Sequence, residues 1–184
     1  MLGGILTIAL LLGGCFGSSG GAASTAPEEK KIEGFHAIAT DEFYIQIPDG
    51  WDALKEVDFK SGTSKNVVAA FRSNVRSPKF TSNIVIVKNE LGAESQASDY
   101  GKALRQKIIG ELSALKELAV EEGSSTLFLS VEGRESDDAD VKRFVEKSHV
   151  KGKTAYIAVG SFLASEDDGT AKKVETAVRS FEVK

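Results

Sequence analysis

The stretch RFVEKSHVKGKTAYIAVGSFLA, residues Arg143–Ala164, decides the fold. Two runs rich in β-branched, aromatic and small apolar residues, Arg143–Val150 and Thr154–Ala164, flank the short Lys151-Gly152-Lys153 segment. Such runs are typical of β-strands, and a short connection that contains glycine is typical of a hairpin turn. Because so short a turn can join only antiparallel neighbours, the stretch predicts an antiparallel pair of strands.

More strands are expected around this hairpin. In Phe43–Ile47 (FYIQI) apolar residues alternate with Tyr44 and Gln46, as in a half-buried strand. Asn83–Lys88 (NIVIVK) is apolar on both faces, as an interior strand covered by helices would be. Further predicted strands are Val67–Phe71 and Thr126–Val131, the second of which opens a hairpin with a polar tip.

Apolar residues three or four apart predict two helices, Ser95–Leu118 and Asp167–Ser180. The stripe of the first helix comprises Tyr100, Leu104, Ile108, Leu112 and Leu115. The inner face of the second comprises Ala171, Val174 and Val178. The predicted order is β-β-(loop)-β-β-α-β-β-β-α, in which consecutive strands are joined by short turns. The expected fold is therefore of the mixed α/β (α+β) class, with a central antiparallel β-sheet sandwiched by α-helices.

The first residues of the chain have a different character. No charged side chain occurs before Glu28, and Ile5–Leu12 is an apolar run too short to span a bilayer. Its length fits a secretory signal, although no Lys or Arg precedes it. Leu12-Gly13-Gly14-Cys15 resembles the lipobox of bacterial lipoproteins, and the resemblance implies lipid transfer to the Cys15 thiol and cleavage before Cys15.

Three segments are expected from this pattern. Residues 1–14 form the signal peptide, residues 15–33 a flexible Gly/Ser/Ala-rich tether, and residues 34–184 the globular domain. The acyl chains on Cys15 would hold the protein on the extracytoplasmic side of the cell membrane. With one cysteine no intramolecular disulfide can form, and a net charge of −4 gives no reason to expect nucleic-acid binding.

Five motifs in order resemble the PsbP-like family, named for an extrinsic subunit of the photosynthetic oxygen-evolving complex. They are FYIQIPDGW, FTSNIVIV, SDYGKAL, KGKTAYIAVGSF and VRSFEVK, spread over Phe35–Lys184. The resemblance implies a central antiparallel sheet sandwiched by helices. Its members include photosystem subunits, a nuclear Ran-binding relative and bacterial lipoproteins without an assigned role. It carries no metal or cofactor residue onto this chain, and we interpret Trp51, at a sheet end, and Asn83, at a strand entry, as structural.

The residues give little sign of catalysis. The only histidines, His36 and His149, are both expected at the surface, and no Gly-x-Ser-x-Gly elbow occurs. The acidic segment Glu132–Asp140 lacks the Gly and Glu that a calcium-binding EF-hand loop requires, and is interpreted as a solvated hairpin tip. We therefore predict no enzyme activity, no metal site and no cofactor.

One stretch is basic within an otherwise acidic chain. Between Phe59 and Asn89 there are six Lys and Arg side chains and no acid. The predicted partner-binding residues are Lys65, Arg72, Arg76 and Lys79. Such a face would suit an acidic protein, anionic lipid headgroups or a wall polymer.

Three functions are open at this point. The first is a membrane-anchored, non-catalytic binding or assembly module outside the cytoplasm. The second is an envelope enzyme, such as a hydrolase with an unrecognised pair of acids. The third is a carrier of a small ligand or ion in a cleft between sheet and helix.

Overall fold

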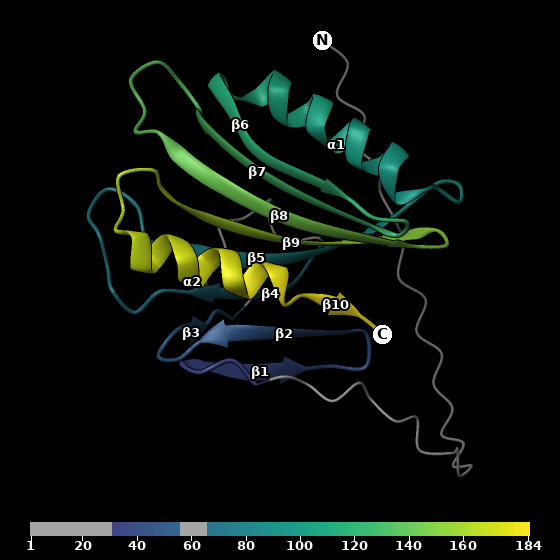
Figure 1. The fold of residues 1–184 in the computed structure, drawn as a ribbon, viewed down its shortest axis with the longest axis horizontal. Helices are drawn as coiled ribbons and strands as arrows, with labels where there is room; N and C mark the ends of the chain where they lie inside the picture. The colour runs from purple at the N-terminus through teal and green to yellow at the C-terminus, as the bar shows by residue number, and fades with distance from the viewer. Residues whose placement is uncertain (1–30, 56–65) are drawn as a thin grey trace. The chain divides into compact units, whose positions relative to one another are not determined.

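A computed structural model describes residues 31–55 and 66–184, which form two antiparallel sheets and two helices (Figure 1). The predicted signal peptide, most of the tether and Lys65 lie outside the described residues. The strands are β1 (Phe35–Ala39), β2 (Phe43–Pro48), β3 (Asp52–Ala53), β4 (Val67–Arg72), β5 (Asn83–Glu90), β6 (Ser113–Glu122), β7 (Thr126–Arg134), β8 (Lys142–Lys151), β9 (Thr154–Leu163) and β10 (Glu182–Val183). The helices are α1 (Ala97–Glu111) and α2 (Asp168–Arg179).

The larger sheet has the strand order β3-β4-β5-β9-β8-β7-β6, and the smaller has the order β1-β2-β10. All strand pairs of the described residues are antiparallel, which confirms the predicted α+β class. The hairpin of β8 and β9 pairs Lys142 with Leu163 and Lys151 with Thr154, as its sequence predicts. Its turn contains Gly152 at φ +62°, a left-handed conformation that favours glycine.

The two helices cover opposite faces of the larger sheet. Because side chains alternate along a strand, Leu127 and Phe128 of β7 point to different faces. Gly101 of α1 packs against the Leu127 side chain, whereas Arg179 at the end of α2 stacks on the Phe128 ring. The α2 helix also contacts β2, so it packs against both sheets (Figure 1). The main apolar core surrounds α2 and includes Val174, Val178 and Phe181.

The α2 helix forms as the sequence predicts. Asp167 is its N-cap and accepts a hydrogen bond of 2.9 Å from the backbone N–H of Thr170. This backbone hydrogen bond lowers the pKa of the Asp167 carboxyl. Val174 and Val178 are completely buried, and Ala171 packs beside them, which confirms the predicted inner face.

The prediction of a single helix over Ser95–Leu118 is wrong in its second half. Helix α1 ends at Glu111, and Ser113–Glu122 forms the edge strand β6. The sequence SALKELAVEE consists largely of helix formers, but pairing with β7 determines the conformation. Two register irregularities interrupt this pairing, and Ala114 has φ +51°. Leu115 therefore lies on a strand and not on the predicted helical stripe.

The predicted order also lacks the last strand of the smaller sheet. This strand is β10, which has two residues: Glu182 pairs with Tyr44 of β2, and Val183 pairs with Phe43. The backbone N–H of Ile32 donates to Gln46 Oε1 at 2.8 Å, so the described part of the chain is held to the sheet from close to its first residue. Ile32 also packs against the apolar core.

Candidate functional site

The predicted partner-binding residues that the structure describes lie at the end of β4 and in the loop that follows it. Arg76 and Lys79 are exposed, whereas Arg72 is half-buried and its Nε atom has no hydrogen-bond partner among the described residues. Arg76 forms an ion pair of 2.8 Å with Asp52, and Lys79 one of 3.2 Å with Asp140. The predicted basic face is thus partly neutralised by acids from other parts of the chain.

The loop that carries these residues, 73–82, is anchored at both ends. The backbone N–H of Ser73 donates to the carbonyl of Ser82 at 2.9 Å, and Ser82 Oγ donates to Glu166 Oε1 at 2.9 Å. Ser73 and Ser82 are themselves buried, whereas Val75 at the tip is 76% exposed. The loop therefore presents the exposed apolar side chains of Val75 and Pro78 beside Arg76 and Lys79.

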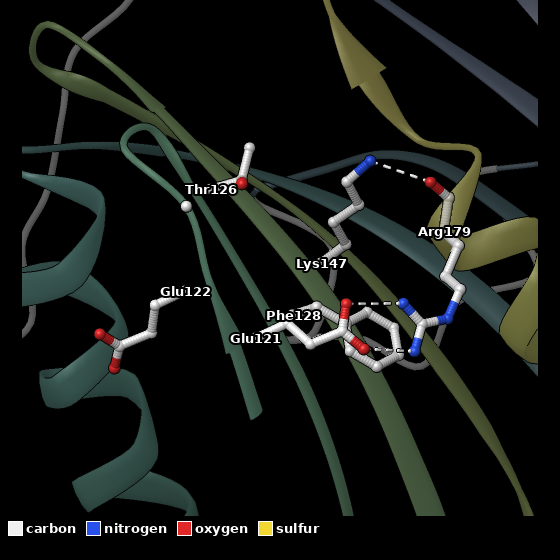
Figure 2. A pocket seen from close by; sticks show the side chains of 7 residues that line it. Glu121, Glu122, Thr126, Phe128, Lys147 and Arg179 are labelled. Atoms are coloured by element: carbon white, nitrogen blue, oxygen red, sulfur yellow. Dashed lines mark hydrogen bonds and ion pairs between the residues drawn. The ribbon is translucent and has the colours of Figure 1, made fainter. Parts of the chain in front are cut away.

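One pocket of about 300 Å³ lies between β6, β7, β8 and the end of α2 (Figure 2). Arg179 occupies it: its guanidinium donates to both Glu121 oxygens, at 2.8 and 3.0 Å, and lies 3.6 Å from the centre of the Phe128 ring. The hydrogen bonds that Arg179 donates to the Glu121 carboxylate raise the pKa of the guanidinium. Lys147 donates to the Arg179 carbonyl at 2.9 Å and to Glu182 at 2.6 Å.

Because both cations of this pocket already have carboxylate partners, we interpret the cluster as a structural clamp. It connects the C-terminal end of α2 to the edge strand β6. Arg179 also donates to Glu175, one helical turn earlier, at 2.9 Å. Bidentate pairs stacked on an aromatic ring hold their geometry well, which suits this role.

A second pocket, of about 270 Å³, lies between the end of α1 and the larger sheet. Its apolar walls are Leu112, Phe144 and Val159. Its polar lining comprises Ser161, Glu111, Glu135 and Glu146. Of these acids only Glu146 is buried, at 8% exposure, on the central part of β8 between Leu129 of β7 and Val159 of β9.

The environment of Glu146 is unusual for a carboxyl group. Its Oε2 atom is buried and has no hydrogen-bond partner among the described residues. Burial raises its pKa to about 7, and the nearby Lys107 offsets only part of this effect. A carboxyl with such a pKa changes its charge near neutral pH, and carboxyls with pKa values shifted by burial cluster at functional sites.

Sequence reasoning missed Glu146. The signal was present, since Glu146 interrupts a strand face whose cross-strand neighbours, Leu129 and Val159, are apolar. Recognising it required the register of three strands, which the sequence alone does not supply.

The two histidines lie in different surroundings. His36 is exposed, as predicted, and its Nδ1 lies 3.3 Å from Asp49. The prediction that His149 lies at the surface is wrong: it is 8% exposed, packs edge-on against Phe181, and its Nε2–H donates to the Phe181 carbonyl at 3.1 Å. The segment after α2 folds back over β8 and covers it. Burial lowers the pKa of His149, and Lys147 adds to this effect.

Asn83 and Trp51, which we interpreted as structural residues, make contacts within the fold. Asn83 Nδ2 donates to the carbonyl of Thr81 at 3.2 Å, at the entry of β5, which confirms the prediction. Trp51 is half-buried between β2 and β3 and packs against the apolar core. The acidic hairpin tip is exposed as expected, and Glu135 there forms an ion pair with Lys142 at 2.9 Å.

Two further findings concern the described residues only. Over residues 31–55 and 66–184, no three acidic, histidine or cysteine side chains are grouped so that they could hold a metal ion. In the same part of the chain, neither helix has the length and apolar character needed to cross a bilayer.

Comparison with known proteins gives similarity at the level of structure. No family model matches the sequence, and no curated protein matches it. The solution structure of cyanobacterial PsbP (CyanoP) from Synechocystis sp. PCC 6803 is similar with a TM-score of 0.55 at 15% identity, over 88% of this chain and 99% of that one.

Two other structures are similar to the same degree. They are the Ran-binding protein Mog1p of Saccharomyces cerevisiae (TM-score 0.54, 10% identity, 77% of this chain and 89% of that one) and LpqN, involved in cell envelope biogenesis of Mycobacterium tuberculosis (TM-score 0.54, 12% identity, 77% and 82%). At such identities the likeness establishes fold and not function. The described part of this chain has the α+β fold shared by PsbP and Mog1p.

Proposed function

We propose that this chain is a lipid-anchored, non-catalytic binding or assembly module that works on the extracytoplasmic side of a cell membrane. The observation that carries the proposal is the Leu12-Gly13-Gly14-Cys15 motif after a short apolar run. Cleavage before Cys15 and acylation would leave the folded domain on a tether rich in Gly, Ser and Ala.

The fold supports an accessory role in place of catalysis. It is shared with a Ran-binding protein and with a protein involved in cell envelope biogenesis. Within the described residues the histidines contact Asp49 and the Phe181 carbonyl, and neither is hydrogen-bonded to a serine or threonine hydroxyl. These contacts do not form the nucleophile and base pair that a hydrolase of the serine type requires.

The partner surface that we propose comprises Lys65, Arg72, Arg76 and Lys79, with an acidic protein as the partner. The ion pairs of Arg76 with Asp52 and of Lys79 with Asp140 are exposed. Exposed pairs contribute only about 0–1 kcal/mol each. Partner carboxylates can therefore displace Asp52 and Asp140 at little cost, and the exposed Val75 supplies an apolar contact next to Arg76.

The anchor is tested by changing Cys15 to Ser in the full chain, expressed in a bacterium supplied with a labelled fatty acid. We expect label and membrane association in the wild type and in Ser18→Ala, and neither in Cys15→Ser. Mass spectrometry of the wild type should find Cys15 as the first residue. Residues 1–14 still attached, with an unmodified thiol, would contradict the anchor.

The partner surface is tested by the double change Arg76→Glu and Lys79→Glu in the full chain. We expect cross-linking to a partner in native membranes to fall about tenfold, the equivalent of about 1.4 kcal/mol. The matched control, Lys172→Glu with Lys173→Glu, makes the same change of charge on exposed residues of α2. Equal cross-linking in both variants would rule out the acidic protein, and binding to phosphatidylglycerol vesicles lost only in the first variant would instead indicate a lipid.

A further inference from the structure

The pocket between α1 and the larger sheet, described above, combines a small apolar cavity with a buried acid. Its volume of about 270 Å³ is just below the range of about 300–1,000 Å³ that is usual for small-molecule sites. The walls come from two parts of the chain distant in sequence: Leu112 directly follows α1, and Phe144 and Val159 belong to the hairpin of β8 and β9. Such a cavity can enclose only a small ligand.

Two buried polar atoms lie on the same face of β8 without hydrogen-bond partners among the described residues. One is Glu146 Oε2, which lines the pocket. The other is Oγ of Ser148, which is completely buried two residues further along the strand. Native proteins rarely leave such atoms unpaired, because a buried polar group without a partner costs about 1–3 kcal/mol. Ser148 does not line the pocket, so Glu146 Oε2 is the buried atom at which this pocket offers an acceptor to a polar ligand.

The charges around Glu146 determine which polar group fits. Glu111 and Glu135, which also line the pocket, are exposed and already face Lys107 at 3.9 Å and Lys142 at 2.9 Å. Tyr100 of α1 lies close enough for Glu146 to raise its pKa, and its hydroxyl accepts a hydrogen bond from Asn89, but Glu146 Oε2 accepts none from the described residues. Lys107 is largely exposed. Glu146 is thus the acid of this pocket without a cation in hydrogen-bonding contact.

We propose that this pocket binds a small organic cation, a primary ammonium on a short apolar body. The ammonium donates to Glu146 Oε2, and the apolar body packs on Leu112, Phe144 and Val159. An anionic ligand is disfavoured because three carboxyl groups line the cavity. A neutral apolar ligand would leave Glu146 unpaired. This binding site is independent of the membrane anchor and of the basic loop.

The proposal has a consequence for pH. The ammonium needs an ionised Glu146, whose pKa in the free protein is raised to about 7 by burial. A primary amine stays protonated throughout this range. Affinity therefore falls as Glu146 takes up its proton, by about tenfold between pH 8 and pH 6, as the ionised fraction of a group with that pKa does.

The test is calorimetric titration of the full chain with n-hexylamine and with n-hexanol, which has the same alkyl chain without the charge. We expect n-hexylamine to bind the wild type at pH 8, about tenfold more weakly at pH 6, and n-hexanol at least tenfold more weakly than n-hexylamine at pH 8. Glu146→Gln should abolish the preference for the amine. Glu33→Gln, which removes the same charge from an exposed residue that does not line the pocket, should keep it.

Three results would overturn the proposal. Equal affinity of wild type and Glu146→Gln for n-hexylamine would overturn the proposal, and so would equal affinity of the wild type for the amine and the alcohol. Absence of binding of n-hexylamine to the wild type at pH 8 would also overturn it. Circular dichroism spectra of the variants that match the wild type would show that lost binding is not lost folding.

Discussion

Glu146→Gln is expected to raise the free energy of unfolding at pH 8 by about 3 kcal/mol, and the melting temperature by about 6–12 °C. The folded protein holds the pKa of this carboxyl at about 7, against 4.5 for an unperturbed glutamic acid. Keeping Glu146 ionised therefore costs more in the folded protein than in the unfolded chain. Glutamine has nearly the same shape and never ionises.

The direction of the pH dependence follows from this difference. A group whose pKa is raised on folding contributes stability that is fully present below its unfolded pKa and is lost as the pH rises through its folded pKa. The wild type should therefore lose stability between about pH 4.5 and 7, and Glu146→Gln should lose much less. Thermal unfolding at pH 5 and pH 8 measures the effect. A difference between the proteins that is the same at both pH values would contradict the assignment.

His149 titrates in the opposite sense and is present in both proteins. Burial lowers its pKa, so its contribution is present above the ordinary histidine value of 6.5 and is lost as the pH falls through its folded pKa. Because this loss is common to wild type and variant, it cancels from the comparison. Glu33→Gln is a suitable control, since it removes a carboxylate from an exposed residue that does not line the pocket of Glu146.

Gly160→Ala is expected to destabilise the protein by about 1–3 kcal/mol. A methyl group at Gly160 would lie 2.3 Å from Val174 Cγ1 and 3.0 Å from Val178 Cγ2. Both valines are completely buried, so neither can move aside without disturbing the contact between α2 and β9. Urea denaturation monitored by Trp51 fluorescence measures the change, and an unchanged midpoint would mean that the helix can shift freely on the sheet.

Gly110→Ala is the matched control for this substitution. It adds the same methyl group, but nothing lies within 4 Å of the new atom, and Gly110 is within α1. Because alanine is the better helix former, stability should rise by about 0.5–1 kcal/mol. Opposite signs for the two substitutions would locate the effect in packing and not in the loss of glycine itself.

The fold was predictable where periodicity and turn chemistry agree. The hairpin of β8 and β9 and the capped helix α2 have unambiguous patterns, and the structure confirms them. The segment Ser113–Glu122 was not predictable, because its residues favour a helix locally and only the neighbouring strand β7 stabilises the extended form. The two-residue strands β3 and β10 are too short to give any pattern.

The candidate site was less accessible to sequence reasoning than the fold. The basic stretch is visible as a charge pattern, but the partners of Arg76 and Lys79 come from Asp52 and Asp140, which only the folded chain brings near. Burial of His149 and Glu146 likewise depends on which face of β8 each occupies and on which helix covers that face. Such information lies in the register and layering of the sheet, not in the local sequence.

The edge strand β6 has a consequence for self-association. An exposed sheet edge offers unpaired backbone groups to a strand of another copy, and this risk grows when copies are concentrated on a surface. In β6 the regular ladder is broken twice, and Lys116, Glu117, Glu121 and Glu122 place charges along it. A second copy adding its own β6 would have to pair with an irregular backbone lined by charged side chains, which disfavours edge-to-edge association of the sheet.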